Sequence, residues 1–160
     1  MLRLVGALCI GGAAMAAGMS AAGMLHTRVM QLEAFFTLIS HIASQVAHFR
    51  TPLDAIYAAF ESAALENCGF LAALRAHGGS EALGMTSARL YLTRAETAVL
   101  AEFFGGLGQH DAGEEARHIA YYEARIGAMA KTARAELAAK ARLCRALGAL
   151  AGVMLAVMLL

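Results

Sequence analysis

The stretch from Leu4 to Leu25 constrains this chain more than any other feature, because 22 consecutive residues carry no charged side chain. A helix rises about 1.5 Å per residue, so this run would be roughly 33 Å long, enough to cross the hydrocarbon core of a bilayer. Its several glycines are typical of membrane helices, where small residues let neighbouring helices approach closely. We therefore predict an N-terminal transmembrane helix over residues 1–25.

A cleavable signal peptide is the alternative interpretation of the same run. Arg3 would then form the basic N-terminal region, and Ala14-Met15-Ala16 has the small-x-small pattern of a cleavage site. The apolar run continues well past that site, which favours a retained span, and cleavage stays open as the second interpretation.

The C-terminal end is also free of charge. Ala146–Leu160 covers 15 residues, which would form a helix of about 22 Å, shorter than a usual span. A helix beginning at Leu143 would be long enough if the Arg145 side chain reached toward the headgroups. We predict a second transmembrane helix over 146–160, with an interfacial or re-entrant tail as the alternative.

Two spanning ends would place both termini on one side of the membrane and residues 26–145 on the other. Basic residues flank the middle segment, and a single acid, Glu136, stands among those near its C-terminal end. The positive-inside rule then predicts a multi-pass protein with a cytoplasmic middle domain. The basic residues are Arg28, Lys131, Arg134, Lys140, Arg142 and Arg145.

Composition narrows the fold and function classes further. Hydrophobic residues make up 59% and charged residues 16%, against about 25% charged in a typical soluble domain. A single proline favours long helices and an all-α fold. The formal net charge of +1 argues against nucleic-acid binding, which normally needs a strong basic excess.

Periodic apolar residues after the first span predict that its helix continues to Arg50. Thr51-Pro52 has the residue types of a helix start, with Thr51 as the cap and Pro52 at the first helical position, and we expect this helix to reach Glu66. Shorter helices should follow, one to Ala76 and one within 81–92. The predicted stripe is Val29, Leu32, Phe36, Ile39, Ala43 and Val46.

Two further helix starts are visible. Thr93 and Glu96 have the spacing of a capping box, and Asp111 with Glu114 repeats it at the start of the last helix. That last helix should continue into the C-terminal span and pair antiparallel with the first, forming a stalk at the membrane. Its predicted stripe is Ile119, Tyr122, Ile126, Met129, Ala133 and Leu137.

Few residues offer reactive chemistry. Glu115 and His118 form a Glu-x-x-His pattern of the kind that binds iron in helical bundles, but such sites need a second copy and further glutamates. Gly105–Gly108 lacks the Lys-Ser/Thr of a phosphate-binding loop. We predict no catalytic residue, no cofactor, no metal and no enzyme activity, and keep a membrane-tethered metalloprotein and a holin-like pore former as alternatives.

Several short motifs, taken together, carry a family resemblance. The chain opens Met1–Ala7 directly into an apolar run and begins a helix at Thr51-Pro52-Leu53. It then has Leu107-Gly108-Gln109-His110-Asp111 before His118-Ile119, and closes with Arg145–Gly152. In order and in total length it resembles the stage III sporulation protein AB family over essentially the whole chain.

The resemblance implies a structural membrane component of the sporulation channel complex between mother cell and forespore, located in the mother-cell (outer forespore) membrane. The family's middle domain is similar to the cytoplasmic helical domain of type II secretion F platform proteins. Implied partners are membrane lipid, the ATPase of the apparatus and its other membrane subunits, together with self-association. Such fold-level analogy supplies an expectation only.

The resemblance also marks candidate interaction residues. Asp111 and His118 stand where the family has an Asp and a His at the start of the last long helix. The family pattern has a Ser before that Asp and a Gln three residues before that His, whereas this chain has His110 and Glu115. We expect Asp111 to cap the helix and His118 to bond to a neighbouring helix. The full candidate set is Thr51, Pro52, Leu107, Gly108, Asp111 and His118.

Overall fold

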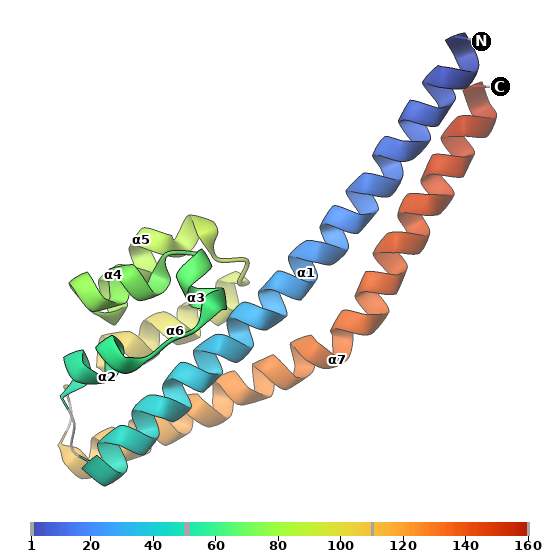
Figure 1. Cartoon of the computed structure of the whole chain (residues 1–160). Helices are drawn as coiled ribbons and strands as arrows, with labels where there is room; N and C mark the ends of the chain where they lie inside the picture. The colour runs from blue at the N-terminus through green and yellow to red at the C-terminus, as the bar shows by residue number, and fades with distance from the viewer. Residues whose placement is uncertain (1, 50–51, 110, 160) are drawn as a thin grey trace. The chain divides into compact units, whose positions relative to one another are not determined.

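The computed structural model describes the backbone of residues 2–49, 52–109 and 111–159, and side chains at 13, 16, 19–46, 52–109, 111, 113–144, 146–150 and 154. All regular structure within these ranges is helical, which confirms the all-α prediction (Figure 1). The elements are α1 (Leu2–Phe49), α2 (Leu53–Ala59), α3 (Ala63–Asn67), α4 (Phe70–His77), α5 (Gly79–Thr86), a single 3₁₀ turn (Ser87–Arg89), α6 (Arg94–Gly106) and α7 (Ala112–Leu159).

The chain divides into two compact units. Unit 1 comprises residues 1–27 and 133–160, and unit 2 comprises residues 28–132. The long helices α1 and α7 each contribute a segment to both units. The predicted domain boundaries at 25/26 and 145/146 concern membrane embedding, which is a different property from compactness.

Unit 1 consists of the N-terminal part of α1 and the C-terminal part of α7, which lie side by side (Figure 1). Among the described residues, no helix contains a stretch both long and apolar enough to cross a bilayer. Both predicted spans, Leu4–Leu25 and Ala146–Leu160, consist largely of residues whose side chains lie outside the description, and they stay predictions.

In unit 2, α1 and α7 pack against each other in antiparallel directions, as predicted. Ser40 Oγ donates a hydrogen bond to Glu123 Oε1 at 2.5 Å. One turn earlier on α1, Phe36 lies against Gly127, four residues later on α7, where a Cβ atom would come within 2.9 Å of the ring. Since the contact moves backward on α1 as it moves forward on α7, the two helices run in opposite directions.

The core of unit 2 is a chain of aromatic rings that joins α1, α4 and α6. Phe35 meets Phe70 edge to face with ring centroids 4.8 Å apart, and Phe70 lies 5.8 Å from Phe104. All three side chains are buried, as are Leu38 and Ile42 on α1. Edge-to-face pairs of this kind contribute about 0.5–1.5 kcal/mol beyond the area they bury.

The apolar stripe predicted on α1 is confirmed for only some of its residues. Val29, Leu32 and Ile39 are buried as expected, but Phe36 is only half-buried, as are Ala43 and Val46. The reason is that α1 contacts α4 on one side and α7 on another, so its apolar surface is wider than one helical stripe.

The helix predicted from Thr51 to Glu66 is wrong, because it breaks at Phe60. Phe60 is extended and buried, and Ser62 is extended before α3 begins. The Arg75 guanidinium on α4 donates to the carbonyl oxygens of Tyr57 and Phe60, at 3.2 and 2.8 Å. These bonds satisfy carbonyls that a helix end leaves without partners, so α2 can stop there.

One residue, Gly78, joins α4 to α5. Its N–H donates to the Leu74 carbonyl of α4, and its own carbonyl accepts from the Ala82 N–H of α5, both at 3.0 Å. Its φ of +81° is accessible to glycine at little cost. The next residue, Gly79, also needs its missing side chain, since a Cβ would lie 2.1 Å from Phe104 Cδ1.

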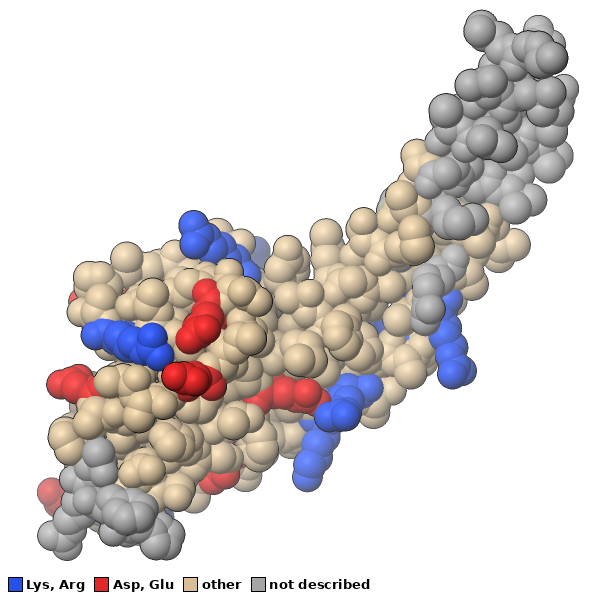
Figure 2. All heavy atoms as spheres, viewed as in Figure 1, with Lys and Arg blue, Asp and Glu red and all other residues tan. Residues whose placement is uncertain are grey.

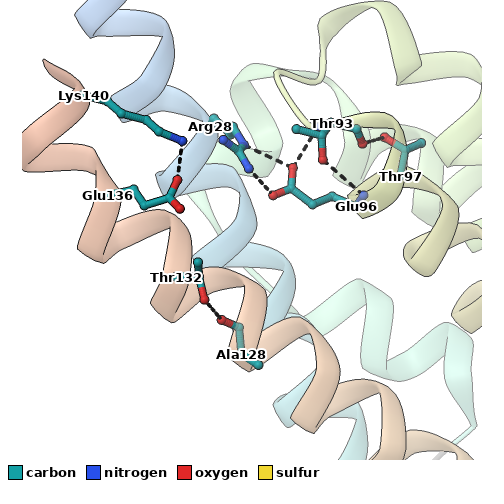
Figure 3. A network of polar contacts seen from close by, with 8 residues as sticks. All are labelled: Arg28, Thr93, Glu96, Thr97, Ala128, Thr132, Glu136 and Lys140. Atoms are coloured by element: carbon teal, nitrogen blue, oxygen red, sulfur yellow. Dashed lines mark hydrogen bonds and ion pairs between the residues drawn. The ribbon is translucent and has the colours of Figure 1, made fainter. Parts of the chain in front are cut away.

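Polar side chains on α1 hold the segment that leads into α6. The buried Gln31 side chain accepts from the Tyr91 N–H at 2.8 Å and donates to the Arg89 carbonyl at 3.4 Å. Arg28 forms an ion pair with Glu96 at 2.6 Å (Figure 3). Arg28, one of the basic residues from which the membrane topology is predicted, therefore has a packing role within unit 2.

Glu96 also completes the predicted capping box at the start of α6. Its backbone N–H donates to Thr93 Oγ1 at 3.3 Å, and its carboxylate accepts from the Thr93 N–H at 2.7 Å (Figure 3). Burial raises the pKa of the Glu96 carboxyl, but its hydrogen bonds to Arg28 and Thr93 outweigh that effect, and the pKa is lowered overall.

Candidate interaction site at the α6–α7 turn

A buried carboxylate on α7 holds the turn between α6 and α7 in place. We use the name α6–α7 turn for Leu107, Gly108, Gln109 and Asp111. Gly108 has a φ of +80°, and its N–H donates to Glu115 Oε1 at 2.9 Å. Glu115 lies in the first turn of α7 and is only 8% exposed. A carboxylate near a helix N-terminus interacts favourably with the helix dipole, so the same side chain stabilises both the helix start and the turn.

His118 ties α7 to the end of α6, as expected from sequence. Its Nε2 atom lies 3.2 Å from the Phe103 carbonyl oxygen, and since a carbonyl oxygen only accepts, Nε2 carries the proton in this contact. The imidazole stacks on the Phe103 ring at 5.9 Å with an interplanar angle of 15°. Gly106 makes room for it, because a Cβ there would lie 2.5 Å from His118 Cε1.

The start of helix α2 also lies at the α6–α7 turn. The position that a Cβ would occupy on Gly108 lies 3.7 Å from Leu53 Cδ1, so the start of α2 contacts the turn. Burial, together with the negative charges of Asp54 and Glu115, raises the pKa of Tyr57 to about 12. The Tyr57 hydroxyl is therefore neutral and lies close enough to Glu115 to sense its charge.

Two of the candidate residues, Thr51 and Pro52, precede α2 in the chain. Thr51 lies outside the described residues. Pro52 precedes α2 instead of occupying its first helical position, and its carbonyl accepts from the Ala55 and Ile56 N–H groups at 3.0 and 3.3 Å. The predicted helix start was one residue early, because the helical backbone begins at Leu53 and Pro52 is extended.

The remaining candidates converge on the turn itself. Leu107 ends α6 in an extended conformation. Asp111 directly precedes α7, as predicted, and its carbonyl accepts from the Glu114 and Glu115 N–H groups at 2.9 and 2.8 Å. Gln109 and Asp111 are exposed. Residues from motifs more than 50 positions apart in the sequence therefore meet at one end of unit 2.

Sequence analysis predicted no partner for Glu115 and did not point to Tyr57. In sequence, Glu115 stands out as half of a Glu-x-x-His pattern and as the residue at the family's Gln position, whereas its carboxylate accepts from a backbone N–H seven residues earlier. Its spacing from His118 does place both on one face of α7, and that was the available signal. Within the described parts of the chain, no group of three or more His, Cys, Asp or Glu is placed to hold a metal ion.

These features define a class of protein: an all-helical chain with very long first and last helices and a set of shorter helices, α2–α6, that come between them in sequence (Figure 1). The side chains at the turn bond mainly to backbone groups, which suits holding a surface in shape. The chain belongs to the stage III sporulation protein AB family, whose model matches residues 3–160. The comparisons with curated proteins and with solved structures found no match. This is a family of sporulation proteins and is not known as an enzyme family.

Proposed function

We propose that this chain is a structural membrane component of the sporulation channel complex between mother cell and forespore, and that it is a platform for the ATPase and other membrane subunits of that apparatus. The observation that carries the proposal is the family match over residues 3–160. The platform role follows the similarity of the family's middle domain to type II secretion F proteins.

Membrane insertion through both ends is part of the proposal. It is supported by the uncharged runs Leu4–Leu25 and Ala146–Leu160, and the basic residues that flank the middle segment support a cytoplasmic position for residues 26–145. The membrane would be that of the mother cell around the forespore, with the protein spanning it twice.

The α6–α7 turn is the docking surface that we propose for the ATPase. It presents the exposed Gln109 and Asp111 on a base held by Glu115 and His118. A surface already ordered before binding loses less conformational entropy when a partner docks. The three family motifs that lie in unit 2, at Leu53, Leu107–Asp111 and His118, meet at this turn, which favours it over the other exposed surfaces of unit 2.

Deleting the gene in its native host tests the proposed function directly. We expect a collapse in the count of heat-resistant spores, with forespores arrested after engulfment under the microscope. A plasmid-borne copy of the wild-type chain should restore the count. Normal sporulation of the deletion strain would overturn the proposal.

The docking surface has a separate test. Asp111→Lys reverses an exposed charge at the turn, and Glu61→Lys is the matched control, because Glu61 is also exposed but lies between α2 and α3. We expect Asp111→Lys to lower both spore count and co-purification of the ATPase, with Glu61→Lys close to wild type. Equal effects of the two substitutions would remove the turn as the docking site.

A further inference from the structure

Unit 1 contains many more basic than acidic residues. Residues 1–27 and 133–160 contain five Lys or Arg residues and one acid, Glu136, which leaves a net charge of +4. The Glu136 carboxylate accepts a hydrogen bond from Lys140 Nζ (Figure 3). The basic residues other than Arg3 all lie between Arg134 and Arg145 on α7.

The helix that shares unit 1 with this segment brings no compensating charge. The α1 residues from Leu4 to Leu25 are all uncharged. Arg134, Lys140 and Arg142 are exposed. In unit 2, by contrast, acidic and basic side chains are mixed over α2–α6 (Figure 2). With Glu136 as its one acid, this part of α7 therefore carries an excess of exposed positive charge.

An exposed apolar face begins directly after the basic segment. Leu143, Leu147 and Leu150 are 59%, 57% and 65% exposed. Their spacing of four and then three residues places them on one face of α7, and Met154 continues that face at 76% exposure. Large apolar side chains that repeat on one exposed helix face mark a binding surface.

We propose that this segment of α7 binds anionic phospholipid headgroups through Arg134, Lys140 and Arg142, while the face that starts at Leu143 lies among the acyl chains. The order of the two surfaces on one helix, cationic and then apolar, matches the order of headgroup and hydrocarbon in a bilayer leaflet. A nucleic acid or an acidic protein would match only the cationic part. The inference rests on the proposed membrane position and adds the class of lipid.

Lipid selectivity measured by electron spin resonance tests this directly. The full chain is reconstituted into bilayers that contain spin-labelled phosphatidylglycerol or, separately, spin-labelled phosphatidylcholine. The fraction of motionally restricted label gives the ratio of the two association constants. The test variant is the double substitution Arg134→Gln with Arg142→Gln, and the control is Arg94→Gln with Arg117→Gln, two exposed arginines of unit 2.

We expect wild type and control to prefer phosphatidylglycerol, and the preference to weaken at high salt. One basic side chain near an anionic surface changes affinity by up to about fivefold, so the test variant should lower the ratio by about twofold or more. A wild-type ratio of 1, or a test variant equal to the control, would overturn the inference while leaving membrane insertion intact. The absence of restricted label with either lipid would overturn the membrane position itself, and with it the inference.

Discussion

Replacing Glu96 by alanine should lower the free energy of unfolding by about 2–4 kcal/mol, because one carboxylate has two structural roles. It accepts from the Thr93 N–H in the capping box and pairs with Arg28 on α1. The Glu96 side chain is 5% exposed and that of Arg28 is 23% exposed, so the pair is mostly, but not wholly, out of water.

The magnitude follows from these two roles. Loss of helix capping costs about 0.5–2 kcal/mol. Removing one partner of a fully buried ion pair costs about 3–5 kcal/mol, but Arg28 can turn partly toward solvent, so we expect less than half of that. Glu96→Gln keeps a residue that suits the third helical position of a capping box and should cost only about 1–2 kcal/mol.

Thermal unfolding of the purified full chain, followed by circular dichroism, is the assay. In a protein of this length 1 kcal/mol corresponds to roughly 2–4 °C in Tm, so Glu96→Ala should melt about 5–12 °C below wild type. Hydrogen exchange should show faster exchange at the start of α6. The matched control is Glu61→Ala, an exposed glutamate that should shift Tm by no more than about 1–2 °C.

The pH dependence has a definite sign. Because the pKa of Glu96 is lowered in the folded protein, its contribution to stability is fully present above the ordinary glutamate pKa of about 4.3. That contribution falls as the pH drops through the folded pKa. The stability gap between wild type and Glu96→Gln should therefore narrow in acid. A gap that widens below pH 4, or a Glu96→Ala variant as stable as the control, would refute this account of the pair.

Other positions give further predictions. Gly106→Ala should destabilise the protein by about 1–3 kcal/mol, since its Cβ would displace the His118 imidazole. Gly84→Ala, with open space around the new Cβ, should be neutral or stabilise the protein by up to about 1 kcal/mol. Chemical denaturation measures both changes, and equal effects would contradict the packing argument. In an ultraviolet titration, one tyrosine should ionise near pH 12, and this ionisation step should be absent from Tyr57→Phe. An unchanged titration curve for the variant would show that Tyr57 is not the tyrosine that ionises near pH 12. Because this pKa lies above the ordinary value of 10, the stability linked to Tyr57 is present below pH 10 and is lost as the pH rises toward 12.

The helical class and most helix starts could be predicted from sequence because they depend on local rules. The Thr93–Glu96 capping box and the position of Asp111 before α7 follow from residue type and spacing within one turn. The break of α2 at Phe60 could not be predicted in this way. It depends on Arg75, which comes from another helix and bonds to the freed carbonyls.

The candidate site shows the same division. Gly108 and His118 could be singled out from motifs, and each has a structural role at the turn. The roles of Leu53 and Tyr57 depend on how α2 packs beside α7, a contact between segments far apart in sequence. Glu115 could be singled out from sequence, but its partner could not be predicted. The partner is a backbone N–H, and residue type does not show which backbone N–H a side chain will bond to.

The single-residue joint at Gly78 limits how the sequence can change in length. An α-helix turns about 100° per residue, so one residue inserted between Leu74 and Ala82 would rotate α5 by more than a quarter turn about its axis. Its buried residues, Ala82 and Leu83 among them, would then point away from the core. Insertions and deletions among related sequences should avoid this joint and accumulate instead around Glu61, where the extended backbone between α2 and α3 can lengthen without rotating a helix.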